Sequence, residues 1–356
     1  MNSARSWPAV IAAVTGSVMV GFMPIMARHL YADGLDAPSM LFWRYTIALP
    51  VLLIAAMATR LDLIRAWRGG AWKIALVGAT LGVGQTICFW ESIRFIDTGL
   101  ADLLFYTYPG LTLLLDRLLF GRTIRAKAVL CVAIILLGAA LITVPGLRGG
   151  SIDLRGLLWA IPSPLIYVFY LAANSVLLRG QKPLTGALCL YSGMALAFAA
   201  ACAVGGLDVP ANADTWALMV LAALGPGALT ITLFSYSVPR LGPSSYAIIA
   251  NMELVTVVTV GVTLLGEKMT AERAMGGALI VAGIVGYGLL RTLVTSSSLS
   301  TPGGGEGRGE AGDSSGVGAR PPHPPSAARW APPSPPMGGE GKWGLRRLEQ
   351  PAQHVL

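Results

Sequence analysis

The sequence predicts an all-α integral membrane protein with ten transmembrane helices in two inverted five-helix repeats. Three observations support this fold class. Over half of the 356 residues are hydrophobic (54%) and only 12% are charged, whereas a soluble domain carries about 25% charged residues. The apolar residues fall into blocks of about 20, enough for a helix to cross a ~30 Å hydrocarbon core. The two halves of the chain also resemble each other.

Each apolar block is expected to be a helix, because backbone groups in lipid must be bonded within their own segment. Short polar, proline-rich or glycine-rich breaks such as "RGG" at 68–70 and "RGQKP" at 179–183 separate the blocks. The first block is longer than the apolar core of a signal peptide, so we expect it to be retained. The predicted spans are residues 8–27, 38–58, 71–91, 99–119, 126–145, 156–178, 184–205, 214–236, 244–265 and 273–293.

The orientation is predicted from the basic residues, which accumulate on the cytoplasmic side of membrane proteins. With the N-terminus inside, the cytoplasmic side carries 11 of them through the tenth span and the opposite side carries 6. We therefore expect a multi-pass protein of the plasma or inner membrane with both termini cytoplasmic. The cations form no single stripe, so the net charge of +8 does not indicate nucleic-acid binding. The two sets are Arg5, Arg60, Arg65, Arg68, Lys73, Arg122, Arg125, Lys127, Arg179, Lys182 and Arg240, and Arg28, Arg94, Arg148, Arg155, Lys268 and Arg273.

No cofactor, metal site or catalytic group is expected. Cys88, Cys131, Cys189 and Cys202 all fall inside apolar spans and fit small buried side chains. Two of the three histidines lie in the C-terminal tail, and no metal-ligand spacing is present. No nucleotide-binding P-loop motif occurs either, so any transport would draw on a gradient or a counter-substrate.

The C-terminal residues differ in composition from the rest of the chain. Residues 294–356 are dominated by Gly, Pro and Ser and bury too little apolar surface to offset the entropy of ordering. We expect a disordered cytoplasmic tail. Its "PPSPP" stretch could form a polyproline II recognition segment, although a dispensable extension is the interpretation that we favour.

An internal duplication relates the third to fifth spans to the eighth to tenth at an offset of 145 residues. The loop "LLFGRTIRA" aligns with "TLLGEKMTA". We therefore expect two domains, residues 1–148 and 149–293. Because five is an odd number of spans, the second copy enters the membrane from the other side, and inverted repeats of this kind place a site near the bilayer midplane. The matching pairs include Phe89 and Phe234, Ser92 and Ser237, Gly121 and Gly266, and Gly138 and Gly283.

Two segments resemble the drug/metabolite transporter superfamily, in its ten-helix branch built from two EamA-type domains. They are "FWESIRFIDTGLADLLFYTYPGLTLLLDRLLFGR" and "SYSVPRLGPSSYAIIANMELVTVVTVGVTLLGEKMTAERAMGGALIVAGIV". The resemblance covers about residues 8–293 and implies export or exchange of small organic metabolites or drugs. Two positions depart from the family pattern: Leu254 replaces a proline, and Arg122 stands where the first-half loop would carry Glu.

Glu253 is the most unusual residue of the apolar spans, since it lies almost halfway along residues 244–265. Such a carboxyl usually faces a cavity or a partner. We expect it to bind a cationic group or a proton, beside Tyr246 on the same helix face. A role in helix packing alone is the alternative.

Two other spans carry polar stripes. Ser163, Tyr167, Tyr170 and Asn174 share one helix face, which fits a substrate pathway or contacts between helices. Tyr106 and Tyr108 align with Asn251 and Glu253 in the repeat, so these four should flank one pseudo-symmetric site. On the same face as Tyr106, we expect Asp102 to be a gate group and Asp116 to reach the lipid headgroups together with Arg117.

Three further polar residues complete the predicted site. Arg44 is placed well inside the second span and could snorkel outward, pair with an internal carboxylate or bind a substrate carboxylate. Gln85 shares a face with Gly78 and Gly82, a spacing that favours close helix approach, and is a candidate pathway residue. Glu91 is a second possible gate.

These features favour a secondary-active transporter, an exporter or exchanger of small amphipathic metabolites such as amino-acid-like or aromatic cationic compounds, over an enzyme or a passive channel. Its expected partners are the lipid bilayer, the small-molecule substrate and protons. A monomer suffices for a complete pathway, and the glycine-rich faces could also serve a homodimer.

Overall fold

The computed structural model describes residues 7–297 apart from residues 97, 122, 145–152 and 267. They belong to one unit, Met1–Pro302, and the second unit, Gly303–Leu356, lies outside the described residues together with nearly all of the predicted tail. The prediction of ten transmembrane helices is confirmed. Within the described residues, ten helical stretches are long and apolar enough to cross a membrane: Trp7–Ala32, Ala37–Ala58, Leu63–Ser92, Gly99–Phe120, Ala126–Thr143, Leu154–Leu177, Pro183–Gly205, Ala213–Leu241, Pro243–Leu264 and Ala271–Leu290.

The first five of these stretches make up the first repeat. Several are interrupted, and at the "RGG" break Gly70 has a φ of 97°, which ends one helix and starts the next. The segments are α1 (Trp7–Val20), α2 (Met23–Ala32), α3 (Ala37–Ala58), α4 (Leu63–Ala66), the kinked turn η2 (Trp67–Ala71), α5 (Trp72–Val77), the π-helical turn η3 (Gly78–Gly82), α6 (Val83–Ser92), α7 (Thr98–Phe105), α8 (Tyr108–Phe120) and α9 (Ala126–Thr143).

The second repeat has the same plan. At the predicted "RGQKP" break Gly180 has a φ of 76°, and Pro183 starts the next helix, where its missing N–H costs nothing. The segments are α10 (Leu154–Ala160), α11 (Pro162–Leu177), α12 (Pro183–Gly205), α13 (Ala213–Ala222), the π-helical turn η5 (Ala223–Leu229), α14 (Thr230–Leu241), α15 (Pro243–Ala250), α16 (Met252–Leu265) and α17 (Ala271–Ser297).

The irregular features of the two repeats fall at equivalent positions. The π-helical turns η3 and η5 begin 145 residues apart. The same offset relates Tyr106 and Asn251, where the fourth and ninth spans are interrupted. It also relates Gly121 and Gly266, which end α8 and α16 in the left-handed conformation with φ of 61° and 67°. The duplication is therefore present in the geometry of the backbone as well as in the sequence.

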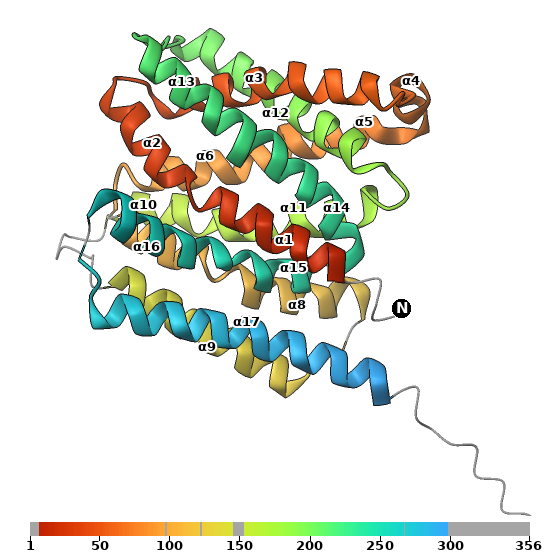
Figure 1. Cartoon of the computed structure of the whole chain (residues 1–356), viewed down its shortest axis with the longest axis vertical. Helices are drawn as coiled ribbons and strands as arrows, with labels where there is room; N and C mark the ends of the chain where they lie inside the picture. The colour runs from red at the N-terminus through yellow and green to blue at the C-terminus, as the bar shows by residue number, and fades with distance from the viewer. Residues whose placement is uncertain (1–6, 97, 122, 145–152, 267, 298–356) are drawn as a thin grey trace, which may run out of the picture. The chain divides into compact units, whose positions relative to one another are not determined.

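Equivalent spans run in opposite directions, as expected for inverted repeats. The end of the fourth span meets the start of the ninth, because the Ser244 hydroxyl donates to the Asp116 carboxylate. The start of the second span meets the end of the seventh, because the backbone N–H of Asp208 donates to the Ser39 hydroxyl at 2.9 Å. The fifth and tenth spans, α9 and α17, also lie side by side (Figure 1).

Glycines allow α9 and α17 to approach each other closely. A methyl group added to Gly276 would lie 2.6 Å from the carbonyl oxygen of Gly138, and one added to Gly138 would lie 2.6 Å from that of Gly276. A methyl on Gly283 would lie 2.9 Å from the carbonyl of Cys131. These glycines form the surface through which α17 packs against α9, whereas Gly277 faces open space.

The two ends of the helix bundle are packed differently. We call the end where α1 begins the near end and the opposite end the far end; they lie at the right and left of Figure 1. At the near end α14 packs against α11, α12 and α15, and α15 packs against α8. The equivalent far-end pairs, α6 with α1, α6 with α3 and α7 with α16, are packed less closely than these near-end pairs in the described part of the chain. Instead, the rings of Tyr31 on α2 and Trp90 on α6 bridge the far end, with centroids 5.3 Å apart.

Candidate functional site

The interruptions of the fourth and ninth spans bring polar side chains to the middle of the bundle. Pro109 stands in the first turn of α8, just after the break. In the ninth span the Asn251 side chain donates to the carbonyl of Ala247 at 2.8 Å and so competes with the helix ladder. Tyr106, Tyr108 and Asn251 are all buried, and Glu253 follows in the first turn of α16.

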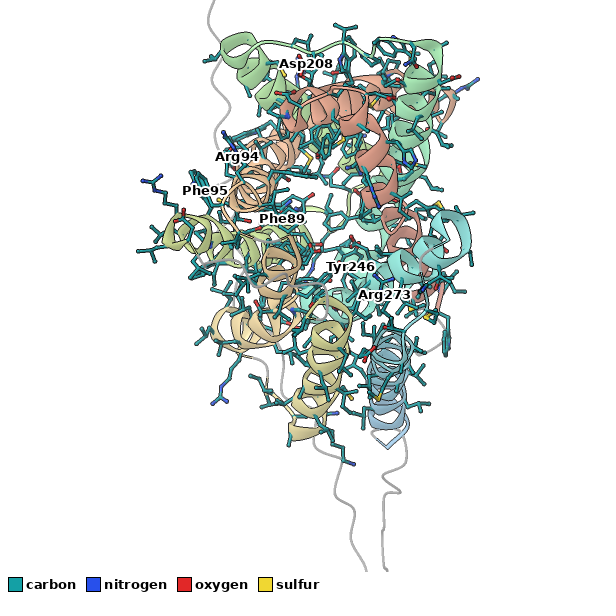
Figure 2. All side chains as sticks on the ribbon, turned by 90° about the vertical axis from the view of Figure 1, so that its left-hand side faces the viewer. Phe89, Arg94, Phe95, Asp208, Tyr246 and Arg273 are labelled. Atoms are coloured by element: carbon teal, nitrogen blue, oxygen red, sulfur yellow. The ribbon has the colours of Figure 1, made fainter. Side chains whose placement is uncertain are left out.

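A chain of aromatic rings surrounds this point. Tyr108 contacts Tyr167 edge to face with centroids 5.0 Å apart, and Tyr167 stacks on Tyr170 at 6.0 Å. Tyr170 stacks on Phe234, which meets Tyr246 edge to face at 5.2 Å. On the other side Phe105 joins Phe89 to Tyr108. Figure 2 looks at the bundle from the far end and shows Phe89 and Tyr246 near the middle of its cross-section.

The Glu253 carboxyl has no fixed partner in the part of the chain that the structure describes. It is partly buried and makes no hydrogen bond or ion pair with any residue that the structure describes. Glu253 interacts electrostatically with four tyrosines, Tyr106, Tyr108, Tyr167 and Tyr246. A charged residue inside a membrane protein normally has a partner, and the described residues supply none for Glu253.

Two further charged groups act on Glu253 electrostatically, Asp102 and Arg44. Asp102 is partly buried on α7 and, like Glu253, makes no hydrogen bond or ion pair among the described residues. The other predicted gate residue, Glu91, is engaged elsewhere. It forms an ion pair of 2.9 Å with Arg94, whose side chain is 69% exposed at the far end (Figure 2).

Arg44 points into the bundle rather than outward. Its Nη2 donates to the carbonyl of Pro226 in η5 at 2.8 Å, its guanidinium carbon is 5.8 Å from the centre of the Tyr45 ring, and the Tyr191 hydroxyl is within its hydrogen-bonding reach. The snorkelling alternative is therefore wrong. Arg44 Nε is buried without a hydrogen-bond partner among the described residues.

The polar stripe of the sixth span divides into two groups. Tyr167 and Tyr170 belong to the ring chain. Ser163 donates to the carbonyl of Gln85 at 3.0 Å and so ties α11 to α6, while the Gln85 side chain donates to Thr86 at 2.7 Å. Asn174 bonds to the carbonyl of Tyr170 in its own helix at 2.9 Å and leaves Oδ1 buried without a partner.

Comparisons with known proteins bear on this arrangement. A model of the EamA-like transporter family matches residues 7–144 and 154–289, one match for each repeat. The chain belongs to the EamA-like transporter family. The match confirms the resemblance to the drug/metabolite transporters, and it identifies a multi-pass membrane transporter.

Named relatives of this EamA-like chain include two transporters. It is 27% identical over 304 residues to a probable terminal-alkyne amino-acid exporter of Streptantibioticus cattleyicolor, covering 83% of this chain and 97% of the relative. It is 23% identical over 277 residues to an uncharacterized transporter of Archaeoglobus fulgidus, covering 77% of this chain and 94% of the relative. A solved crystal structure with 20% identity has the same fold, with a TM-score of 0.68 over 80% of this chain and 98% of that one.

One prediction for this EamA-like chain is wrong. Asp116 was expected to reach the headgroups, yet it is only 5% exposed. The start of α15 covers it, and Ser244 on that helix donates to its carboxylate. Helix periodicity placed Asp116 on the correct face, but the covering helix comes from the other repeat, which a single span does not reveal.

Several site residues were missed from the sequence. Tyr45 and Tyr191 pack edge to face at 4.8 Å beside Arg44, and Phe89, Phe105 and Phe234 extend the ring chain. The alignment of Phe89 with Phe234 was visible at the 145-residue offset, and their shared position could have indicated a role in the site. Within the described residues no group of three or more His, Cys, Asp or Glu could hold a metal ion.

Proposed function

We propose that this chain is a secondary-active transporter, an exporter or exchanger that moves small amphipathic metabolites across the membrane by alternating access. The observation that carries the proposal is the Glu253 carboxyl, which lies among tyrosines of both inverted repeats and has no ion-pair partner among the described residues. A structural acid would be expected to have a fixed partner. In a transport site, the substrate takes the place of that fixed partner.

The unequal packing of the two ends supports alternating access. Inverted repeats can exchange conformations, so that the end that is closely packed in one state becomes loosely packed in the other. The near end is held by helix contacts between α8, α14 and α15. The far end is bridged by the long side chains Tyr31 and Trp90, which can separate at a smaller cost than packed backbones.

Amino acids are the substrate class that we propose. The relative from Streptantibioticus cattleyicolor is named for an amino acid with an unsaturated side chain. The site of this chain offers charges of both signs, Glu253 and Arg44, and a chain of rings that suits an apolar or unsaturated side chain.

Membrane orientation and energy source are part of the same proposal. We propose that the near end faces the cytoplasm and the far end the outside of the plasma or inner membrane, with both termini inside. Glu253 is the candidate carrier of a coupling proton. The chain acts as a transporter and not as an enzyme, either as a monomer or as a homodimer through its exposed glycine-containing faces.

The test begins with untargeted metabolite profiling of cells that express or lack the chain. The compounds that accumulate outside expressing cells are then studied by counterflow in proteoliposomes. We expect saturable uptake that is stimulated by substrate trapped inside and lost in Glu253→Gln. The matched control is Glu91→Gln, which removes a carboxyl already paired with Arg94, and it should transport normally.

Other outcomes would contradict the proposal. Flux that rises in proportion to concentration and ignores internal substrate would indicate a channel. Chemical conversion of the compound would indicate an enzyme. A Glu253→Gln variant with unchanged rate and unchanged dependence on a pH gradient would remove Glu253 from the mechanism.

A further inference from the structure

Arg44 has a hydrogen-bonding capacity that its surroundings do not satisfy. A guanidinium carries five N–H donors. One Nη2 donor reaches the carbonyl of Pro226, and the Tyr191 hydroxyl lies nearby. In the part of the chain that the structure describes, Nε is buried without a partner. Because buried donors are nearly always satisfied, an unsatisfied one calls for an explanation.

The bond to Pro226 fixes where Arg44 points. Pro226 lies in η5, and π-helical turns often mark functional sites because they alter the carbonyl ladder. At the 145-residue offset the residue equivalent to Arg44 is Cys189, and at the equivalent turn η3 Gly78 lies against the carbonyl of Leu190 on α12. The arginine therefore makes the two otherwise similar repeats chemically unequal.

Arg44 and Glu253 interact electrostatically but do not form an ion pair. Arg44 acts electrostatically on Glu253, yet no N–O distance within 4.0 Å joins them. Two opposite charges that are not bridged to each other can each bind the complementary charge of one molecule that carries both. An α-amino acid carries an ammonium and a carboxylate on one carbon atom.

We propose that Arg44 makes the site selective for zwitterions: its guanidinium binds the α-carboxylate of an amino acid whose ammonium group lies against Glu253. This inference rests on the proposed transport function and adds the residue that selects amino acids over simple amines. Guanidinium suits this task because its planar fork matches a carboxylate. Tyr45 and Tyr191 are buried and pack against each other beside it.

Three probes that share a phenyl ring test this role. L-Phenylalanine carries both charges, phenethylamine lacks the carboxylate and 3-phenylpropionate lacks the ammonium. Binding of each is measured on the purified full-length chain in nanodiscs. We expect Arg44→Gln to weaken phenylalanine binding at least about tenfold and phenethylamine binding less than about threefold. Arg44→Lys should recover part of the phenylalanine binding.

Arg240→Gln is the matched control. Arg240 also donates to a helix carbonyl, that of Tyr236, but it is exposed at the near end. This variant should bind all three probes as the unchanged chain does. Retained phenethylamine binding by Arg44→Gln shows at the same time that the variant is folded.

Three results would overturn the role of Arg44. Equal loss of phenylalanine and phenethylamine in Arg44→Gln would indicate a structural residue. Unchanged phenylalanine binding would show that Arg44 does not touch the cargo, and the absence of binding of any probe to the unchanged chain would exclude this substrate class. In each case counterflow of the profiled compounds still decides the transport function, so the two proposals fail separately.

Discussion

The hydroxyl of Ser244 donates to the buried carboxylate of Asp116, and this bond joins the start of the ninth span to the end of its counterpart in the other repeat. Ser244 also lies 3.3 Å from the carbonyl of Thr112. The contact holds α15 against α8 where the near end is closed. We infer that it acts as a latch of the near-end-closed state.

The first prediction concerns this latch. Ser244→Ala removes a donor from a buried carboxylate, which should lower the stability of the closed arrangement by about 1–3 kcal/mol. A cysteine introduced at Ser237, which is fully buried on α14, should then be labelled faster in a background without the native cysteines. The neighbouring variant Ser245→Ala loses only a 3.4 Å contact with Tyr287 and should label as before. Equal labelling of the two variants would argue against the latch.

The second prediction concerns the seam between α9 and α17. Gly276→Ala would place a methyl 2.6 Å from the carbonyl of Gly138, and such overpacking typically costs about 1–3 kcal/mol. The thermal unfolding midpoint in detergent should fall. Gly277→Ala, one residue away, meets nothing within 4 Å and should leave the midpoint unchanged or slightly higher. A similar midpoint for both variants would mean that the two helices do not pack through this glycine.

The third prediction concerns the far end. Trp90→Ala removes one ring of the pair that bridges α2 and α6. Far-end labelling of a cysteine introduced at Asp102 should increase several-fold, because the described helices are packed less closely there than at the near end. Trp72→Ala is the control, since that ring is 44% exposed on α5. If the cysteine at position 102 is labelled equally slowly in the Trp90→Ala and Trp72→Ala variants, the Tyr31–Trp90 pair does not close the far end.

The fold could be predicted from the sequence in considerable detail, because membrane helices are defined by length and composition. The irregular turns could not. The π-helical turn η5 depends on Pro226 and the glycines around it, and "GATLG" at η3 has no proline at all. Their equivalence appears only when the backbone of the two repeats is compared.

The site was predicted less completely than the fold. The sequence predicts that Tyr106, Tyr108, Asn251 and Glu253 flank one site, and Glu253 acts electrostatically on both tyrosines. Tyr167 and Tyr170, predicted to line a pathway or a contact between helices, continue the chain of rings from Tyr108. Ser163, on the same helix as Tyr167, instead donates to the backbone carbonyl of Gln85 on α6. Periodicity identifies which residues share a helix face, whereas the neighbour opposite that face is set by packing between repeats, which is why Tyr45 and Tyr191 were missed.

The fourth prediction concerns the opposite insertion of the two repeats. Single cysteines at Thr123 and Met269, in the connections after α8 and α16, are labelled with a membrane-impermeant reagent in sealed cells. We expect Met269→Cys to react from outside and Thr123→Cys to react only after the membrane is opened. Labelling of both from the same side would contradict the inverted arrangement.

Alternating access itself is tested most directly by measuring both ends of the bundle in one experiment. Spin labels at Ala32 and Arg94 report the far end, and a second pair at Arg117 and Arg240 reports the near end; all four positions are exposed. Pulsed electron–electron distance measurements with and without substrate should show two populations. In one the far-end distance is long and the near-end distance is short, and in the other the far-end distance is short and the near-end distance is long. Distances that change together at both ends, or that never change, would contradict transport by this mechanism.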